Sequence, residues 1–407
     1  MRRPQFHLTP GRGWMNDPHG IVFDGTRYHA HFQAVPDSLE WRSDIRWGHA
    51  VSEDLVHWTT LDDALEPTAG EVGCWSGSVV LAAEPMLYYT RPTPGDWSRG
   101  AVVLALGDHA LAHWTRAGVV VPGPPDERFR DVRDPQVRRD DDGWHMTLGA
   151  GWVGVGGAAL QYVSDDGLTW TYDGVLASRA WDADEDFPTG EVWECPQLLE
   201  VDGHWVLLVS AMDLAHEVVD EVLYAVGDYD GHVFSPRRWG RFGHGRMVYA
   251  TSTFRDAEGR PCAMSWLRGL PRDDGQDWNG AQSLVHVLHV VDDRLVVAQH
   301  PALDPVIAVE DPAWRCTVAV DAPGGVAIEV DEEERGWTLV LDFEALALHV
   351  TIDGAITYAA DLRREGDGEL DIVVDAGIAE VTWSAGEGVY EFPVPDLDPV
   401  RIDVATW

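Results

Sequence analysis

The chain of 407 residues is long enough for two or three domains, and 45% of its residues are apolar, which suffices for sizeable hydrophobic cores. Its formal net charge of −40 argues against nucleic acid and anionic membranes as partners, because both are bound through cationic patches. No apolar run approaches the roughly 18 residues of a membrane-spanning helix, and we expect no secretory signal before residue 14. We therefore expect a cytoplasmic protein with a small neutral ligand, and its oligomeric state stays open.

The cysteine, lysine and tryptophan content limits which reactions and ligands we expect. The four cysteines, Cys74, Cys195, Cys262 and Cys316, have no paired spacing, so we expect reduced thiols and neither a metal nor a cofactor. The sequence contains no lysine, which excludes Schiff-base chemistry. Its 20 tryptophans and 10 tyrosines favour a ligand with flat apolar faces and hydrogen-bonding rims, as sugars have.

The first distinctive stretch in the chain runs from Trp14 to Gly20, with the sequence Trp-Met-Asn-Asp-Pro-His-Gly. It places an aromatic ring, an amide, a carboxylate and an imidazole directly before a strand-like run. Pro18 restricts the backbone after Asp17 and Gly20 frees it again, which indicates that the Asp17 carboxylate is held in one direction. This stretch is the first candidate site.

An internal repeat follows. Trp58, Trp114 and Trp170 end three similar segments at intervals of 56 residues, and a weaker copy ends at Phe234. Between these markers lie short runs rich in aromatic and β-branched residues, which predict strands. The second strands are expected at Tyr28 to Gln33, Met86 to Thr90, Trp144 to Ala150, Trp205 to Ala211 and Cys262 to Leu267. The third strands are expected at Trp47 to Ser52, Ala101 to Gly107, Ala158 to Ser164, Val222 to Gly227 and Ala281 to His289.

Four strands repeated five times, with each tryptophan-ending segment supplying the fourth strand, predict an all-β fold. We expect a five-bladed β-propeller over roughly residues 7 to 300. A long β-sandwich is the alternative, but it gives no reason for the constant spacing.

The repeat stops near Leu303, after which apolar and polar residues alternate. Leu346, Leu348, Val350 and Ile352 fall on one face of a predicted strand. This pattern predicts a C-terminal β-sandwich, with domains at residues 1–302 and 303–407.

The first strand of every propeller blade lines the central channel, so unusual residues on those strands should recur at the blade period. Asp17, Ser76, Asp134, Glu194 and Tyr249 do recur, at intervals of 59, 58, 60 and 55 residues. Three carboxylates should therefore meet in one channel. Alignment on the prolines, however, places Glu194 one residue ahead of Asp17 and Asp134, and such an offset normally turns a side chain to the other face of a strand.

Facing carboxylates are what glycoside hydrolysis needs, one as nucleophile or base and one as acid. Trp193 and Cys195 flank Glu194 and predict an apolar environment for it, as a general acid requires.

These motifs resemble those of glycoside hydrolase family 32, which includes invertases, fructanases and sucrose-6-phosphate hydrolases. The resemblance is carried by Trp14 to Gly20, by Arg133-Asp134-Pro135 and by Glu194-Cys195-Pro196. Trp47 to Ser52, Trp75 to Ser78 and Trp278 to Leu284 add to it. The resemblance implies the same fold that the repeat predicts, a five-bladed propeller followed by a β-sandwich.

The resemblance also implies roles for single residues. Asp17 would be the nucleophile, Glu194 the acid and base, and Asp134 the stabiliser of the transition state, with Arg133 beside it as a donor. Asn16, Gln33, Trp41 and Ser76 would line the fructose subsite. The chain departs from the family at His19, where asparagine is usual, and at Trp75, where phenylalanine is common.

We therefore expect a retaining β-fructofuranosidase that acts on sucrose or short fructans through a covalent fructosyl-enzyme. Transfer to a sugar, giving fructo-oligosaccharides or a difructose anhydride, is one alternative, and hydrolysis of sucrose 6-phosphate is another. An arabinan- or xylan-cleaving propeller enzyme and a catalytically silent sugar-binding propeller are further alternatives.

Overall fold

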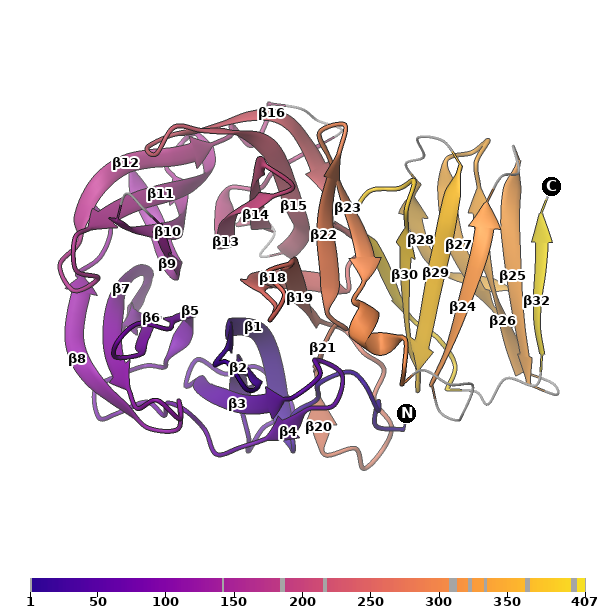
Figure 1. The fold of residues 1–407 in the computed structure, drawn as a ribbon, viewed down its shortest axis with the longest axis horizontal. Helices are drawn as coiled ribbons and strands as arrows, with labels where there is room; N and C mark the ends of the chain where they lie inside the picture. The colour runs from indigo at the N-terminus through magenta and orange to yellow at the C-terminus, as the bar shows by residue number, and fades with distance from the viewer. Residues whose placement is uncertain are drawn as a thin grey trace.

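A computed structural model describes residues 2–140, 143–183, 187–214, 218–306, 313–320, 324–332, 335–362, 367–396 and 401–406. Five blades surround a central channel, and two further sheets lie face to face beside this ring (Figure 1). The second and third blades are joined into one eight-stranded sheet by a single parallel pairing of Arg99 with Val132. The predicted propeller and sandwich are both confirmed. No helix among the described residues is long and apolar enough to cross a membrane.

Each blade is an antiparallel sheet whose first strand faces the channel (Figure 1). The first blade consists of β1 (Gly13–Phe23), β2 (Tyr28–Val35), β3 (Arg46–Ser52) and β4 (Thr59–Thr60). The second consists of β5 (Trp75–Val80), β6 (Met86–Thr93), β7 (Asp96–Gly107) and β8 (Trp114–Val121). The third consists of β9 (Phe129–Asp140), β10 (Gly143–Trp152), β11 (Gly156–Ser164) and β12 (Thr171–Ser178). The fourth consists of β13 (Val192–Val201), β14 (His204–Asp213), β15 (Val218–Tyr229) and β16 (Phe234–Arg241).

The fifth blade is the least regular. It consists of β18 (Val248–Arg255), β19 (Pro261–Leu267), β22 (His286–Val291) and β23 (Arg294–Gln299), with short strands β20 (Trp278–Asn279) and β21 (Ala281–Gln282). The prediction of one strand from Ala281 to His289 is wrong, because β21 and β22 pair with different parts of β19. β20 instead pairs in parallel with β1, and this pairing closes the ring between the last blade and the first.

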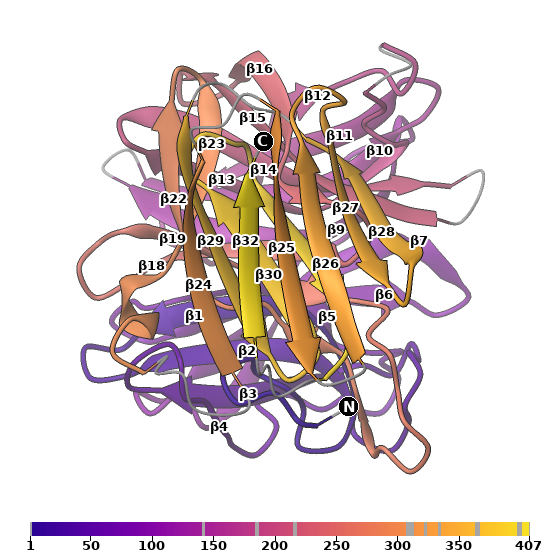
Figure 2. The same ribbon diagram turned by 90° about the vertical axis from the view of Figure 1, so that its right-hand side faces the viewer.

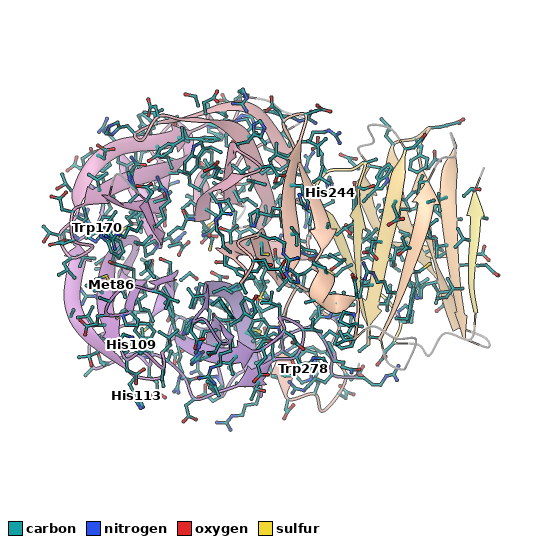
Figure 3. The ribbon with its side chains drawn as sticks, in the orientation of Figure 1. Met86, His109, His113, Trp170, His244 and Trp278 are labelled. Atoms are coloured by element: carbon teal, nitrogen blue, oxygen red, sulfur yellow. The ribbon has the colours of Figure 1, made fainter. Side chains whose placement is uncertain are left out.

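The tryptophan-ending segments are turns, so their assignment as fourth strands is also wrong. In two of them the side chains of a serine and an aspartate accept hydrogen bonds from the following backbone amides, Ser52 with Asp54 and Ser164 with Asp166. Such side chains compete with the sheet for backbone donors and so end a strand. The fourth strand begins at or after the marker, and Trp170 lies at the outer rim of the ring (Figure 3).

Two sheets form the sandwich, which faces the viewer in Figure 2. The inner sheet consists of β24 (Ala313–Val320), β29 (Gly368–Asp375), β30 (Ile378–Trp383), β31 (Val389–Pro393) and the short β17 (Gly243–His244). The outer sheet consists of β25 (Gly325–Glu332), β26 (Arg335–Asp342), β27 (Ala347–Ile352), β28 (Ala355–Asp361) and β32 (Arg401–Thr406). Leu348 and Val350 are buried as predicted, whereas Leu346 is 54% exposed because it lies in the turn before β27.

The propeller and the sandwich share a closely packed interface. β17 pairs with β31, and the ring of His244 stacks on that of Tyr390 at 4.3 Å between centroids. His244 accordingly lies where the two parts meet (Figure 3). The predicted boundary at residue 302 falls within a short 3-10 helix, η1 (Pro301–Leu303), and it stays a prediction.

Candidate active site

The innermost strands carry β-bulges at the places where the three acids occur. β1 loses register between Met15 and Pro18, β9 between Arg133 and Gln136, and β13 between Glu194 and Gln197. A bulge adds an unpaired residue and redirects the side chains around it. Pro18, Pro135 and Pro196 all fall within or beside these bulges, where the ladder does not require an amide donor.

The bulges resolve the one-residue offset of Glu194. Asp134 and Cys195 both have positive φ, 59° and 46°, so they occupy the same position in their bulges. Glu194 therefore corresponds to Arg133, the residue before the bulge. Both Arg133 and Asp134 line the channel, which shows that the bulge turns two consecutive side chains to the same side.

Asp17 is held by donors from three neighbouring positions. Ser76 donates to its Oδ2 at 2.6 Å and Gln33 to the same oxygen at 3.2 Å, while the Asn16 amide donates to Oδ1 at 2.9 Å. Asn16 is in turn bonded to Gln33 Oε1 and receives a hydrogen bond from the Trp14 indole. This network fixes the Asp17 carboxylate and satisfies it while it is charged.

Asp134 and Cys195 lie next to Asp17. The backbone amide of Cys195 donates to Asp134 Oδ2 at 3.0 Å. The Cys195 sulfur is 3.6 Å from that oxygen and 3.7 Å from Asp17 Oδ2. The thiol thus joins two carboxylates, and burial together with its acidic neighbours raises the pKa of Cys195 well above the ordinary value.

Glu194 has polar surroundings, so the predicted apolar environment is wrong. Arg133 Nε is 3.1 Å from Glu194 Oε1, and the Tyr249 hydroxyl donates to Oε2 at 2.7 Å. Trp193 is fully buried on the other side of β13, where its indole donates to the Thr189 carbonyl. Alternation along the strand turns Trp193 away from the channel, whereas the bulge after Glu194 keeps Cys195 on the channel side.

The acids lie around a cavity of about 520 Å³. Of the eight predicted site residues, seven line it, and Ser76 reaches it through Asp17. The lining residues are Trp14, Asn16, Asp17, Gln33, Trp41, Trp75, Trp97, Asp131, Arg133, Asp134, Glu194, Met212, Tyr249 and Trp266. Sequence reasoning missed Trp97, Asp131, Met212 and Trp266 as site residues, and it noted Tyr249 only as a strand opening.

Trp41, Trp75 and Trp97 form an aromatic group at the edge of this cavity. Their rings meet edge to face, with centroids 5.7 to 6.1 Å apart. Trp41 and Trp97 remain 41% and 44% exposed, although large aromatic side chains are usually covered. Exposed rings beside a polar cavity suit the apolar face of a sugar.

Burial and mutual repulsion raise the pKa values of two of the acids. Burial raises the pKa of Asp17, against the hydrogen bond from Ser76, and repulsion by Glu194 adds to the rise. Burial and repulsion by Glu194 outweigh the attraction of Arg133 and raise the pKa of Asp134 to about 7. The hydroxyl groups of a neutral sugar can replace the solvent that burial removes from these two acids.

His19, the departure noted in the first motif, belongs to a buried group of histidines in the first blade. Its ring packs on that of Trp47 at 3.9 Å, and neither ring nitrogen has a hydrogen-bond partner among the described residues. His31 stacks on His49, which is 2.9 Å from His29. Burial lowers the pKa of His31 to about 4 and that of His49 to about 2, and it lowers the pKa of His19 well below its ordinary value.

These histidines should make the protein sensitive to acid. In the unfolded chain they bind protons near pH 6.5, whereas in the folded chain they stay neutral, so stability falls as the pH drops below about 6.5. We expect His19→Phe to remove about 2 kcal/mol of the destabilisation present at pH 5. The measurement is the fall in Tm between pH 8 and pH 5, which should be smaller in the variant than in the wild type.

The exposed His113, at the outer edge of the ring (Figure 3), provides the matched control. His113→Phe should leave the fall in Tm unchanged. An equal fall in Tm for wild type and His19→Phe would show that His19 does not titrate as its burial implies.

The propeller part of the chain matches a known protein family. Residues 7–301 match the model of the glycosyl hydrolases family 32 N-terminal domain. The chain belongs to glycosyl hydrolase family 32. The family and the enzyme class that the motifs predict, a glycoside hydrolase acting on fructofuranosides, are thereby confirmed.

Individual relatives agree with this assignment. A sucrose-6-phosphate hydrolase of Escherichia coli is 30% identical over 313 residues, which are 72% of this chain and 63% of that protein. A sucrose-6-phosphate hydrolase of Zymomonas mobilis is 25% identical over 98% of this chain and 81% of its own length. A solved GH32 β-fructofuranosidase of Bombyx mori has the same fold, with a TM-score of 0.81 at 23% identity, covering 99% of this chain and 92% of that one.

Proposed function

We propose that this family 32 enzyme hydrolyses the β-fructofuranosyl linkage of sucrose or short fructans and retains the configuration at the anomeric carbon. The observation that carries the proposal is the setting of Asp17. Its carboxylate is buried, accepts hydrogen bonds from Asn16, Gln33 and Ser76, and shares one cavity with Glu194. Two carboxyl groups of this kind serve the double displacement of retaining glycosidases.

In the first step, Asp17 attacks the anomeric carbon of the fructosyl unit while Glu194 gives a proton to the departing glycosidic oxygen. The bond to the leaving sugar breaks and an ester to Asp17 forms. In the second step, Glu194 removes a proton from water, whose oxygen displaces Asp17 and releases fructose. Tyr249 and Arg133 position Glu194 for both transfers.

Asp134 and Arg133 are proposed to bind fructose hydroxyls. An ionised Asp134 also stabilises the positive charge that develops on the ring in the transition state. Asn16, Gln33 and Ser76 keep Asp17 in place, and Trp41 lies at the edge of the fructose subsite.

The charge of the cavity favours a neutral substrate over a phosphorylated one. Four carboxyl groups line it, those of Asp17, Asp131, Asp134 and Glu194, and its one basic lining residue among the described residues is Arg133. Arg133 already faces Glu194 and Asp131. A phosphate group would therefore enter a field of its own sign, even though several relatives bear the name sucrose-6-phosphate hydrolase.

A substrate comparison tests this proposal. We expect kcat/KM for sucrose to exceed that for sucrose 6-phosphate by at least about tenfold, because each like-charge contact disfavours the phosphorylated sugar. Inulin and levan of short chain length complete the panel. A preference for sucrose 6-phosphate would refute the choice of substrate, and no turnover of any fructoside would refute the proposed activity.

Transfer to a second sugar is the other candidate function. It is favoured by the exposed Trp41 and Trp97, which offer flat faces for an acceptor sugar next to the proposed fructosyl-enzyme. Products longer than the substrate at high sucrose concentration would support transfer.

The four free cysteines support the proposal that the enzyme works in a reducing compartment, such as the cytoplasm.

A further inference from the structure

A second group of acids and histidines, none of which lines the active-site cavity, is buried where the fifth blade meets the inner sheet of the sandwich. His286 is the first residue of β22, and Glu380 on β30 pairs directly with Glu391 on β31. All three side chains are fully buried. One ligand atom from each lies within 4.8 Å of the other two.

Several polar atoms of this group lack partners. His286 Nε2 and Glu380 Oε2 lie 3.0 Å apart as an ion pair. Among the described residues, neither oxygen of Glu391 and not Nδ1 of His286 makes a hydrogen bond. Three such atoms at one buried place are unusual, since burial without a partner costs about 1 to 3 kcal/mol for each group.

Outer groups hold Glu380 in place. Glu380 uses its other oxygen, Oε1, to accept hydrogen bonds from the Leu284 amide at 2.9 Å and from His7 at 3.0 Å. His7 is in turn 2.9 Å from Asp375. Support of one carboxylate oxygen by outer groups, with the other facing His286 and Glu391, is the arrangement that orients metal ligands.

The charge balance leaves Glu391 without a basic partner among the described contacts. Asp375 is paired with His7, and Glu380 lies against both His7 and His286. Glu391 instead faces the carboxylate of Glu380 on the neighbouring strand. A doubly charged ion between the two glutamates would offset their repulsion.

We propose that His286, Glu380 and Glu391 bind one divalent metal ion of the zinc class. One imidazole nitrogen and two carboxylates are donors that Zn²⁺ accepts, and a Glu391 carboxylate that binds through both oxygens would provide the fourth contact. The ion would join β22 of the propeller to β30 and β31 of the sandwich. It would stabilise the interface and take no part in the reaction.

A neighbouring group of similar composition, Asp256, Cys262 and His300, does not support such a site. Asp256 already accepts hydrogen bonds from the Arg260 side chain, from His300 and from the amides of Glu258 and Arg260. The Arg260 guanidinium supplies the positive charge there. The group of Asp256 thus differs from that of Glu391, because Asp256 has hydrogen-bond partners and lies beside the cationic side chain of Arg260.

The test compares wild type, Glu391→Gln and a control, Glu369→Gln, which changes an exposed residue of the same sheet. Each full-length protein is purified from zinc-supplemented medium, and its metal content and Tm are measured before and after chelation and after return of Zn²⁺. We expect about one zinc ion per chain in wild type and control, and a fall in Tm on chelation that Zn²⁺ reverses. Glu391→Gln should lose zinc affinity by at least about 100-fold and have a Tm that chelation does not change.

The sign of the stability change separates this proposal from a metal-free interface. Without a metal, Glu391→Gln replaces a repelled carboxyl group by a neutral amide and raises Tm. A wild type that lacks zinc, or a Glu391→Gln variant that is more stable than wild type, would overturn the proposal. Should the variant fail to fold, the metal content and chelator response of the wild type still decide the question.

Discussion

Asp17→Ala is expected to lower kcat on sucrose by about 10⁵-fold, which corresponds to about 7 kcal/mol of lost transition-state stabilisation. The variant should fold, because Asp17 is a buried acid whose pKa is raised and whose removal relieves repulsion with Glu194. Added azide should restore part of the activity. Asn16, Gln33 and Ser76 would keep their donors directed into the vacated space, where a small anion can bind.

The product of this rescue identifies the role of Asp17. Azide at the position of the missing nucleophile attacks the substrate directly, so a single displacement should give the α-configured fructosyl azide. NMR of the product measures the configuration. A β-configured product from Asp17→Ala, or full activity without azide, would contradict the role of nucleophile.

Glu194→Ala is expected to have an effect that depends on the leaving group. On sucrose, kcat should fall by about 10³ to 10⁴-fold, because the departing sugar oxygen then leaves without a proton. On an aryl β-fructofuranoside, whose phenolate leaves unaided, formation of the fructosyl-enzyme should slow by less than about tenfold. Stopped-flow release of the phenolate should show a burst, since the base for the second step is also missing.

Tyr249→Phe provides a control for Glu194. It removes the hydrogen bond to Glu194 Oε2 but leaves the carboxyl group, so both substrates should slow by similar, smaller factors. With azide, Glu194→Ala should give the β-configured fructosyl azide, because Asp17 still forms the first bond. Equal losses on sucrose and on the aryl fructoside in Glu194→Ala would rule out the acid role.

Much of the fold was predictable because the chemistry of the chain repeats. Asp17, Ser76, Asp134, Glu194 and Tyr249 recur at the blade period, and all five lie on innermost strands as expected. The fourth strands were misplaced because serine and aspartate markers were read as strand ends, whereas they form the turns before the strands. Local side-chain bonds to the backbone decided these positions.

The site was predictable only in part, for a physical reason. Residues within motifs, such as Asp17 and Asp134, can be recognised by their spacing. Trp97 and Met212 instead reach the cavity from the ends of outer strands, and no common sequence pattern marks them. Glu380 and Glu391 are polar residues in strands of the sandwich, and only the pairing of β30 with β31 and the position of β22 bring His286 to them. No feature of the linear sequence connects these three.

The bulges on the innermost strands have a further consequence for how such a ring evolves new chemistry. A straight strand offers the channel only every second side chain, whereas β1, β5, β9 and β13 each give two successive residues to the site: Asn16 and Asp17, Trp75 and Ser76, Arg133 and Asp134, Glu194 and Cys195. Residues such as Trp75 therefore lie immediately beside residues with proposed roles in the reaction, and we expect substitution of Trp75 to change substrate preference more than the reaction itself.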